Sequence, residues 1–104
     1  MNFQNLVEQF KSQDGVAEST MMGSMCLRYQ GEFVTMFFDK EESLIIKVSP
    51  ERVLELIEDG RGNEFNYTGK RFKEWVLIPL DYEEHYAAFI VEAIEYAKFK
   101  LAAK

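Results

Sequence analysis

The chain has 104 residues, 47% of them apolar and 29% charged, with 18 acidic side chains against 12 basic ones and a net charge of −6 at pH 7. These figures predict one globular domain spanning residues 1–104, with a core large enough to need neither disulfides nor a metal. The negative charge repels phosphate backbones, which argues against nucleic-acid binding by the surface as a whole. The single cysteine, Cys26, has no partner for an internal disulfide, which favours a reducing cytoplasm.

The amino-terminal residues resemble neither a signal peptide nor a membrane anchor. Residues 1–5 carry no basic group, and the apolar residues that follow are spaced rather than continuous. The longest compact apolar runs, residues 33–38 and 87–91, are far shorter than the roughly 18 residues of a membrane span. We therefore expect a cytoplasmic protein that does not enter a membrane.

The first predicted element is an amphipathic helix, which Asp14-Gly15 ends. Its apolar side chains recur at the spacing of one helical face. They are Phe3, Leu6, Val7 and Phe10.

Three β-strands follow, expected at Met21–Tyr29, Phe33–Asp39 and Ser43–Val48. The connections at Gln30-Gly31 and at residues 40–42 are short enough for antiparallel hairpins, so a meander is the simplest topology. In the second strand, apolar side chains occupy both alternating sets of positions. This pattern places that strand in the middle of the sheet.

The second half of the chain begins with Ser49-Pro50, a typical start signal for a helix, and this helix is expected to run to about Glu58. Two strands are expected at residues 65–67 and 73–78. Asp81 and Glu84 have the spacing of a capping box, which predicts a long helix from there nearly to Lys104.

The order helix, three strands, helix, two strands, helix predicts an α+β fold: an antiparallel sheet of about five strands, with its three helices gathered on one face or end. Apolar residues surround most of the last helix, so we expect one side of it to cover a partner, with a homodimer as one arrangement. The candidate dimer residues are Phe89, Ile94, Tyr96 and Phe99.

Residues with catalytic chemistry are sparse. A Cys/His pair has to consist of Cys26, which lies in an apolar strand, and His85, which lies in the first turn of the last helix. A buried inert thiol and a solvated imidazole are the commoner roles for such positions. No ligand set for zinc or a redox metal occurs, and Gly60-Arg61-Gly62 lacks the third glycine of a dinucleotide site. We therefore expect no enzyme, no metal and no cofactor.

One basic cluster contains Lys70, Arg71 and Lys73, with Phe72 between them and Trp75 close by. Cations for phosphates and rings for bases are the components of nucleic-acid sites. Strand alternation, however, directs Phe72 to the face opposite Arg71 and Lys73, which favours a solvated face.

Four short sequence segments stand out by their residues and by their order along the chain. They are MMGSMCL at 21–27, LIIKVSPE at 44–51, YTGK at 67–70 and KEWV at 73–76. Together with Gly31 they resemble the TfoX/Sxy N-terminal domain family, and the similarity extends from Ser19 to the end of the last helix. The chain departs from the family strings at Met22, Ser24, Arg71 and Glu74, where Phe, Gly, Pro and Gly are usual.

The resemblance implies a single-domain, divergent member of this family. The best-known members regulate natural competence and carry a second, helical C-terminal domain, and this chain resembles only their first half. The resemblance therefore implies this family's fold and a regulatory role, and it points to no catalytic residue.

The leading hypothesis is therefore a non-enzymatic cytoplasmic interaction or regulatory domain that acts through protein contacts. One alternative is a small-ligand-binding or enzymatic domain with a cleft between sheet and helices. Another is weak DNA binding through the basic cluster. The candidate interaction surface lies on the sheet and contains Ser24, Arg28, Lys47, Lys70, Arg71, Lys73 and Trp75.

Overall fold

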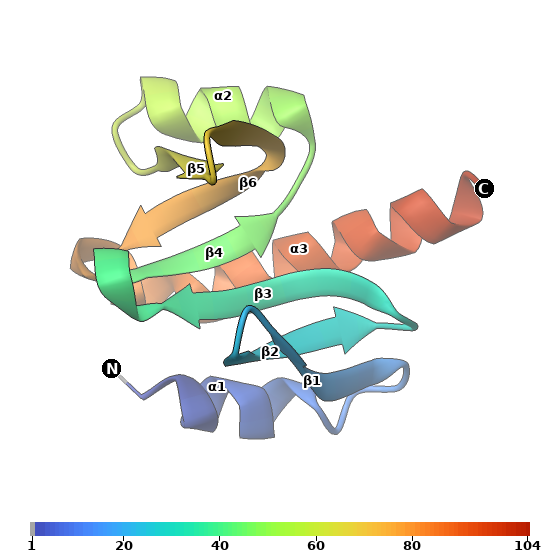
Figure 1. Ribbon diagram of the computed structural model, residues 1–104. Helices are drawn as coiled ribbons and strands as arrows, with labels where there is room; N and C mark the ends of the chain where they lie inside the picture. The colour runs from blue at the N-terminus through green and yellow to red at the C-terminus, as the bar shows by residue number, and fades with distance from the viewer. Residues whose placement is uncertain (1) are drawn as a thin grey trace.

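The computed structural model describes residues 2–104, which form one antiparallel sheet with helices against it (Figure 1). The helices are α1 (Phe3–Phe10), α2 (Pro50–Glu58) and α3 (Tyr86–Ala102), with two short 3₁₀ segments, η1 (Asp39–Glu41) and η2 (Leu80–His85). The strands are β1 (Val16–Met21), β2 (Ser24–Tyr29), β3 (Glu32–Phe38), β4 (Ser43–Lys47), β5 (Asn63–Tyr67) and β6 (Lys70–Pro79). Their spatial order is β1-β2-β3-β4-β6-β5.

The three helices pack on one face of the sheet, which confirms the predicted α+β fold. The main core joins side chains from α1, α2 and α3 to the strand residues Leu27, Val34, Leu44, Ile46, Val76 and Ile78. In Figure 1, α3 runs behind β3 and β4. No helix of the described residues is long and apolar enough to cross a membrane.

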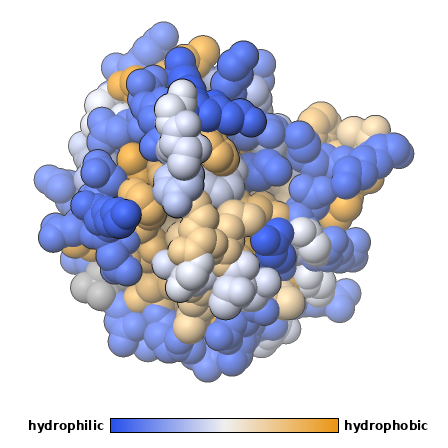
Figure 2. Space-filling model, viewed as in Figure 1, coloured by the Kyte–Doolittle hydropathy of each residue, from blue (hydrophilic) through white to orange (hydrophobic). Residues whose placement is uncertain are grey.

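The opposite face of the sheet carries a second core built only from strand residues, here called the aromatic cluster. Its buried members are Cys26, Phe33, Met36, Ile45, Phe65, Trp75 and Leu77, with Met21, Phe38 and Phe72 packed around them. Figure 2 views this face and shows apolar side chains gathered at its centre, within a largely polar periphery. The rings pack on one another, so this face is filled without a covering helix.

A bulge in β3 changes which residues face the helices. The pairing with β2 shifts between Leu27 and Arg28, so that Val34 has no direct partner. Thr35 pairs with Ile46, whose side chain faces the helices. The consecutive residues Val34 and Thr35 therefore both face the helix-covered side of the sheet. The strict alternation expected from the sequence is wrong at this point, although β3 does lie in the middle of the sheet.

A larger irregularity bends β6 near its start. The register between β5 and β6 shifts around Phe65, which stands opposite residues 72–75. As a result Phe72 and Trp75, three residues apart, both enter the aromatic cluster, with ring centroids 5.0 Å apart. Strict alternation predicts Phe72 and Trp75 on opposite faces of the strand, and this expectation is therefore wrong.

Within residues 2–104 the sheet has six strands rather than the expected five. The additional strand, β1, has one buried residue, Val16, and otherwise half-buried or exposed side chains, so its sequence shows no apolar alternation. A two-residue turn at Met22-Gly23 separates it from β2 where one continuous strand was expected. Both turn residues have positive φ, 54° and 76°, the conformation of tight hairpin turns.

The helix boundaries follow the sequence signals in one case and not in another. The Ser49 side chain accepts a hydrogen bond from the Arg52 N–H at 3.1 Å, and α2 spans the predicted residues. The capping box predicted at Asp81 is wrong, because η2 occupies that segment and α3 begins at Tyr86 without a side-chain cap. The Tyr86 hydroxyl instead donates to the Ile78 carbonyl at 2.7 Å and ties the start of α3 to β6.

Candidate functional site

The bent start of β6 and the end of β4 enclose a cleft of about 380 Å³, here called the β6 cleft. It is lined by Lys47, Lys70, Arg71, Phe72, Lys73, Glu74 and Trp75. Five of the seven residues predicted for the interaction surface thus lie together. Two lining residues, Phe72 and Glu74, are not expected at this site from the sequence, because the bend that gathers them has no periodic signature.

Backbone geometry explains why these residues converge. Lys47 is the last residue of β4 and pairs directly with Trp75, while the Val48 N–H donates to the Glu74 carbonyl at 2.9 Å. The turn Thr68-Gly69, with φ of 53° and 78°, returns the chain and starts β6 at Lys70. Two neighbouring strand ends and one tight turn therefore supply the whole lining.

The rings form the apolar part of the cleft. Trp75 is only 8% exposed and stacks on Phe33, with centroids 4.4 Å apart and planes at 19°. Phe72, which is half-buried, lies against Trp75 and presents its ring to the Lys70 ammonium at 5.8 Å from the centroid. Trp75 therefore belongs to the aromatic cluster and lines the cleft with little exposed surface.

The cations of the cleft are incompletely neutralised. Lys47 lies 3.7 Å from a Glu32 carboxylate oxygen, and Arg71 lies 3.3 Å from one of Glu64, both as ion pairs. Within residues 2–104, Lys70 and Lys73 have no acidic partner. Positive charge is thus concentrated at one site of a protein whose net charge is −6.

Glu74, the acidic residue in the lining, is held by α3. Its carboxylate accepts hydrogen bonds from the Tyr96 hydroxyl and, at 2.9 Å, from the Lys100 ammonium. Burial alone raises the pKa of Glu74, but the Tyr96 hydrogen bond and the Lys100 charge outweigh it, and the net shift is downward. The negative charge of Glu74 is therefore balanced mainly by Lys100, with a smaller contribution from Lys47 of the cleft.

Arg71 and Lys73 also border a second, smaller hollow of about 220 Å³, which they share with Pro50 and Leu54. The Leu54 side chain is 48% exposed. An apolar surface on α2 is thus adjacent to the cations of the β6 cleft.

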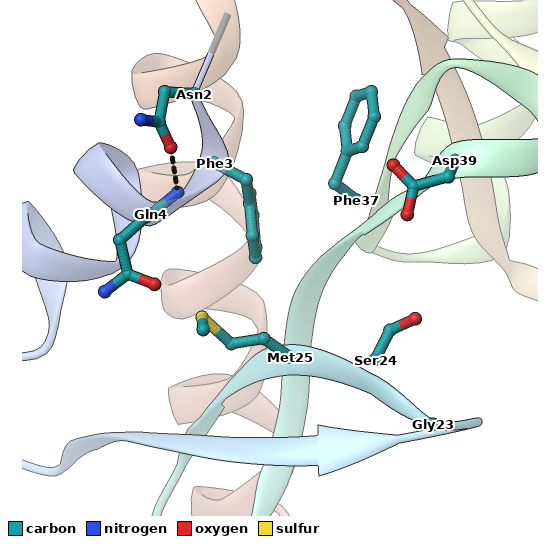
Figure 3. Close-up of a pocket in the computed structure, with 8 residues that line it drawn as sticks. All are labelled: Asn2, Phe3, Gln4, Gly23, Ser24, Met25, Phe37 and Asp39. Atoms are coloured by element: carbon teal, nitrogen blue, oxygen red, sulfur yellow. Dashed lines mark hydrogen bonds between the residues drawn. The ribbon is translucent and has the colours of Figure 1, made fainter.

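Two predicted surface residues lie elsewhere, and for them the prediction of one shared surface is wrong. The Arg28 guanidinium donates to the Gly31 carbonyl at 3.1 Å, within its own hairpin. Ser24 lines a different pocket of about 380 Å³, between the start of α1 and the ends of β2 and β3 (Figure 3).

Among the residues that the structure describes, the pocket in Figure 3 has no cation in its lining. Phe3 and Phe37 form its walls on either side, Ser24 and Asp39 lie on the β-strand side, and the Asn2 side chain caps α1 by accepting the Gln4 N–H at 2.9 Å. The cap engages the Asn2 side-chain oxygen, while the Gln4 side chain also lines the pocket. The pocket therefore lacks the charge concentration of the β6 cleft.

A further pocket, of about 280 Å³, contains two arginines that already have partners. Arg52 is bound by Glu92 at 2.5 Å, and Arg61 by Asp59 at 2.8 Å. His85 also lines this pocket. Because internal carboxylates neutralise both guanidinium groups, this pocket is less suited to an external anion than the β6 cleft.

The structure does not bring Cys26 and His85 together. Cys26 is fully buried in the aromatic cluster, where burial raises the pKa of its thiol. The side chain of His85 is 60% exposed and lines the pocket between α2 and α3. Residues 2–104 contain no group of three or more His, Cys, Asp and Glu side chains placed to hold a metal ion.

The candidate dimer residues on α3 have different environments. Phe89 and Ile94 are 4% and 1% exposed and belong to the main core, so their prediction as interface residues is wrong. Tyr96 is half-buried and bound to Glu74, whereas Phe99 is 65% exposed. The sheet thus covers more of the circumference of α3 than the single narrow apolar stripe of a typical amphipathic helix.

Comparison of the chain with protein-family models, with curated proteins and with solved structures found no match.

Proposed function

We propose that this protein is a non-enzymatic cytoplasmic interaction domain of the TfoX/Sxy N-terminal type, which regulates a partner protein by binding an acidic segment of it in the β6 cleft. The observation that carries the proposal is the pair of lysines beside Trp75, Lys70 and Lys73, for which residues 2–104 supply no acidic partner. The protein elsewhere balances most of its cations with its own carboxylates.

The size and composition of the cleft favour a short peptide segment. A volume of about 380 Å³ accommodates one or two side chains rather than a folded surface. The lysines attract carboxylates, and the Phe72 ring offers an apolar contact. Exposed Leu54, in the adjacent hollow, adds a second apolar contact. We therefore expect the bound segment to combine acidic residues with a neighbouring large apolar residue.

The same cations and rings also occur in single-strand nucleic-acid sites, so a nucleic acid is the competing ligand. The net charge of −6 opposes a long polyanion more than a short peptide, because a polyanion extends past the cleft over acidic surface. The acidic peptide is therefore the favoured occupant.

Trp75 provides the test, because it is the single tryptophan of the chain and lines the cleft. A nine-residue peptide of Glu, Asp and Leu, titrated at 50 mM salt, is expected to change the Trp75 emission in a saturable way. The double variant Lys70→Gln/Lys73→Gln is expected to weaken binding by roughly tenfold or more, since charge-assisted contacts contribute about 1 kcal/mol each.

The matched control Lys11→Gln/Lys40→Gln removes the same charge outside the cleft and is expected to change the affinity by less than about twofold. An oligonucleotide of equal charge is titrated in parallel. Tighter binding of the oligonucleotide, with loss in the cleft variant, assigns the site to nucleic acid and rejects the acidic-segment proposal. An equal effect of the two double variants rejects the cleft as the binding site.

A further inference from the structure

The edge of β6 that faces away from β5 is unpaired at the start of the strand. β4 pairs with β6 only from Trp75 onward, and just beyond this pairing the Val48 N–H donates to the Glu74 carbonyl. The chain then leaves the sheet, because Pro50 begins α2 (Figure 1). Within residues 2–104, the stretch 70–73 of β6 therefore has a strand neighbour on one side only, which is β5.

The hairpin register shows which backbone groups point to this open edge. In a two-residue hairpin the pair that closes the turn exchanges its backbone hydrogen bonds, and here that pair is Tyr67 and Lys70. The next pair along an antiparallel ladder, here Asn66 and Arg71, directs its N–H and C=O groups outward. The Arg71 N–H and C=O therefore point away from β5, to the side on which β4 has already ended.

The hollows described above lie along this same edge. Phe72 packs into the aromatic cluster on one face of the sheet. Arg71 and Lys73 border the smaller hollow beside Leu54, on the face that α2 covers. The β6 cleft nevertheless touches every residue from 70 to 75. Because side chains of a strand point to both faces, a space that meets all of these residues runs along the edge of the strand.

We propose that the acidic segment binds as an added β-strand, antiparallel to β6, in the position that β4 leaves open. The inference rests on the proposed function and specifies the conformation of the partner segment. Main-chain hydrogen bonds to residue 71 supply part of the affinity, and alternate side chains of the segment enter the hollows on the two sides of the edge.

The two sides of the edge favour different side chains. On the side of the aromatic cluster, Lys47 and Lys70 offer their ammonium groups to carboxylates. On the α2 side, Pro50 and the 48% exposed Leu54 supply apolar surface, with Lys73 at its border. A segment in which acidic residues alternate with large apolar ones therefore matches both sides at once.

The charge of the edge also selects the occupant. Natural sheet edges often carry lysines, because like charges keep two identical edges from pairing. Lys70, Arg71 and Lys73 all belong to the open stretch and are all exposed, so the same edge of a second copy is repelled. A strand that carries carboxylates is attracted by the same groups. The cations that oppose self-association thus favour an acidic strand.

Amide hydrogen exchange of the full chain, read by nuclear magnetic resonance, tests this arrangement. The probe is a nine-residue peptide of alternating Glu and Leu. At saturation it is expected to slow exchange of the Arg71 N–H by about tenfold or more, because this group gains a partner. The Lys70 N–H, which already pairs with Tyr67, is the internal control and is expected to change by less than about twofold.

The exchange data separate this inference from the proposed function. Saturable binding that leaves the Arg71 N–H unprotected overturns strand addition but keeps the β6 cleft as the site for the acidic segment. No binding of the peptide overturns both. Protection that rises with protein concentration in the absence of peptide assigns the edge to a second copy and also overturns the inference.

Two variants separate the main-chain contribution from the charge of Arg71. Arg71→Pro removes the guanidinium and the outward N–H, and a strand accepts proline where that N–H makes no bond within the sheet. Arg71→Ala removes the same charge and keeps the N–H. The proline variant is expected to bind the peptide about fivefold more weakly than the alanine variant, with circular dichroism to show that both are folded. Equal affinities overturn strand addition.

N-methylated peptides give a test that leaves the protein unchanged. In an added strand, alternate residues direct their N–H groups to β6 and the others direct them to solvent. Methylating the odd-numbered or the even-numbered amides of the alternating peptide is therefore expected to give affinities that differ by about tenfold or more. A peptide bound as a helix or without regular structure has no such alternation. Equal losses for the two methylated peptides overturn the inference.

Discussion

Trp75 and Phe33 stack with their ring centroids 4.4 Å apart, and through this contact β6 and β3 are joined across the intervening β4. The stack is the centre of a sheet face that carries no helix. Phe72 and Phe65 extend it at centroid distances of 5.0 and 5.3 Å from Trp75. Aromatic packing therefore has the role here that helix burial has on the other face.

The first prediction concerns the stability of this face. Trp75→Ala is expected to lower the free energy of unfolding by about 3–5 kcal/mol, because it empties a large buried site and removes the stack on Phe33. Urea denaturation followed by far-ultraviolet circular dichroism measures the loss. Phe99→Ala, which truncates an exposed ring, is the control and is expected to change stability by less than about 0.5 kcal/mol. Equal losses for the two variants contradict the burial assigned to Trp75.

The second prediction concerns Gly62, where the chain passes between α2 and β6. A Cβ added there lies 2.6 Å from a Val76 methyl carbon and 3.2 Å from the Leu56 Cβ. Gly62→Ala is therefore expected to destabilise the protein by about 1–3 kcal/mol through overpacking.

Val76→Ala provides the internal test of that cause. It removes the methyl carbon that the new Cβ meets, so the double variant is expected to lose about 1 kcal/mol less than the sum of the two single variants. Gly60→Ala is the contrast, since nothing lies within 4 Å of its added Cβ and its cost arises from a φ of 84°. Val76→Ala is expected not to reduce the stability loss caused by Gly60→Ala. If Val76→Ala adds to the loss of Gly62→Ala just as it adds to that of Gly60→Ala, the steric explanation is contradicted.

The third prediction concerns acid stability. The pKa of Glu74 is lower in the folded protein than its ordinary value of 4.5, so the unfolded chain binds more protons in acid. The resulting stabilisation is present above pH 4.5 and is lost as the pH falls from there through the folded pKa. Glu74→Gln is expected to remove this component, giving a smaller loss of stability between pH 7 and pH 3 than in the wild type.

Thermal unfolding across this pH range measures the effect, with Tyr96→Phe as the partner variant. Removing the Tyr96 hydroxyl takes away one of the three groups that lower the pKa of Glu74, which are Tyr96, Lys100 and Lys47, so an intermediate pH dependence is expected. A pH profile of Glu74→Gln parallel to that of the wild type contradicts the assignment.

The sequence predicted elements where local chemistry alone decides the structure. Ser49 and Pro50 are sufficient to start α2, and the glycines at 31 and 69 place two hairpin turns. Strand β1 has a mostly polar sequence, and it forms because its backbone pairs with the edge of β2. No residue pattern within residues 16–21 predicts this pairing. Tertiary pairing decided that element.

The site was predicted to the extent that its residues are neighbours along the chain. Lys70, Arg71 and Lys73 were found as one cluster, and Lys47 and Trp75 join them through strand pairing. The bulges opposite Leu27 and Phe65 reverse side-chain directions without any change in composition. Phe72 was misplaced for that reason. The burial of Phe89 and Ile94 depends on how far the sheet wraps around α3, which periodicity does not report.

The helix-free face also bears on the order of folding. Strands β1 to β4 are joined by short turns, whereas β5 and β6 reach the sheet only after α2 has been completed. The aromatic cluster needs Phe65 and Trp75 from that later segment against Phe33 from the earlier one. Contacts so distant in sequence carry a larger loop-closure cost than the short turns, so we expect them to close later. Until they close, Phe33 and Met36 remain uncovered on the four-strand meander, so self-association during refolding is expected to fall sharply once β6 docks on β4.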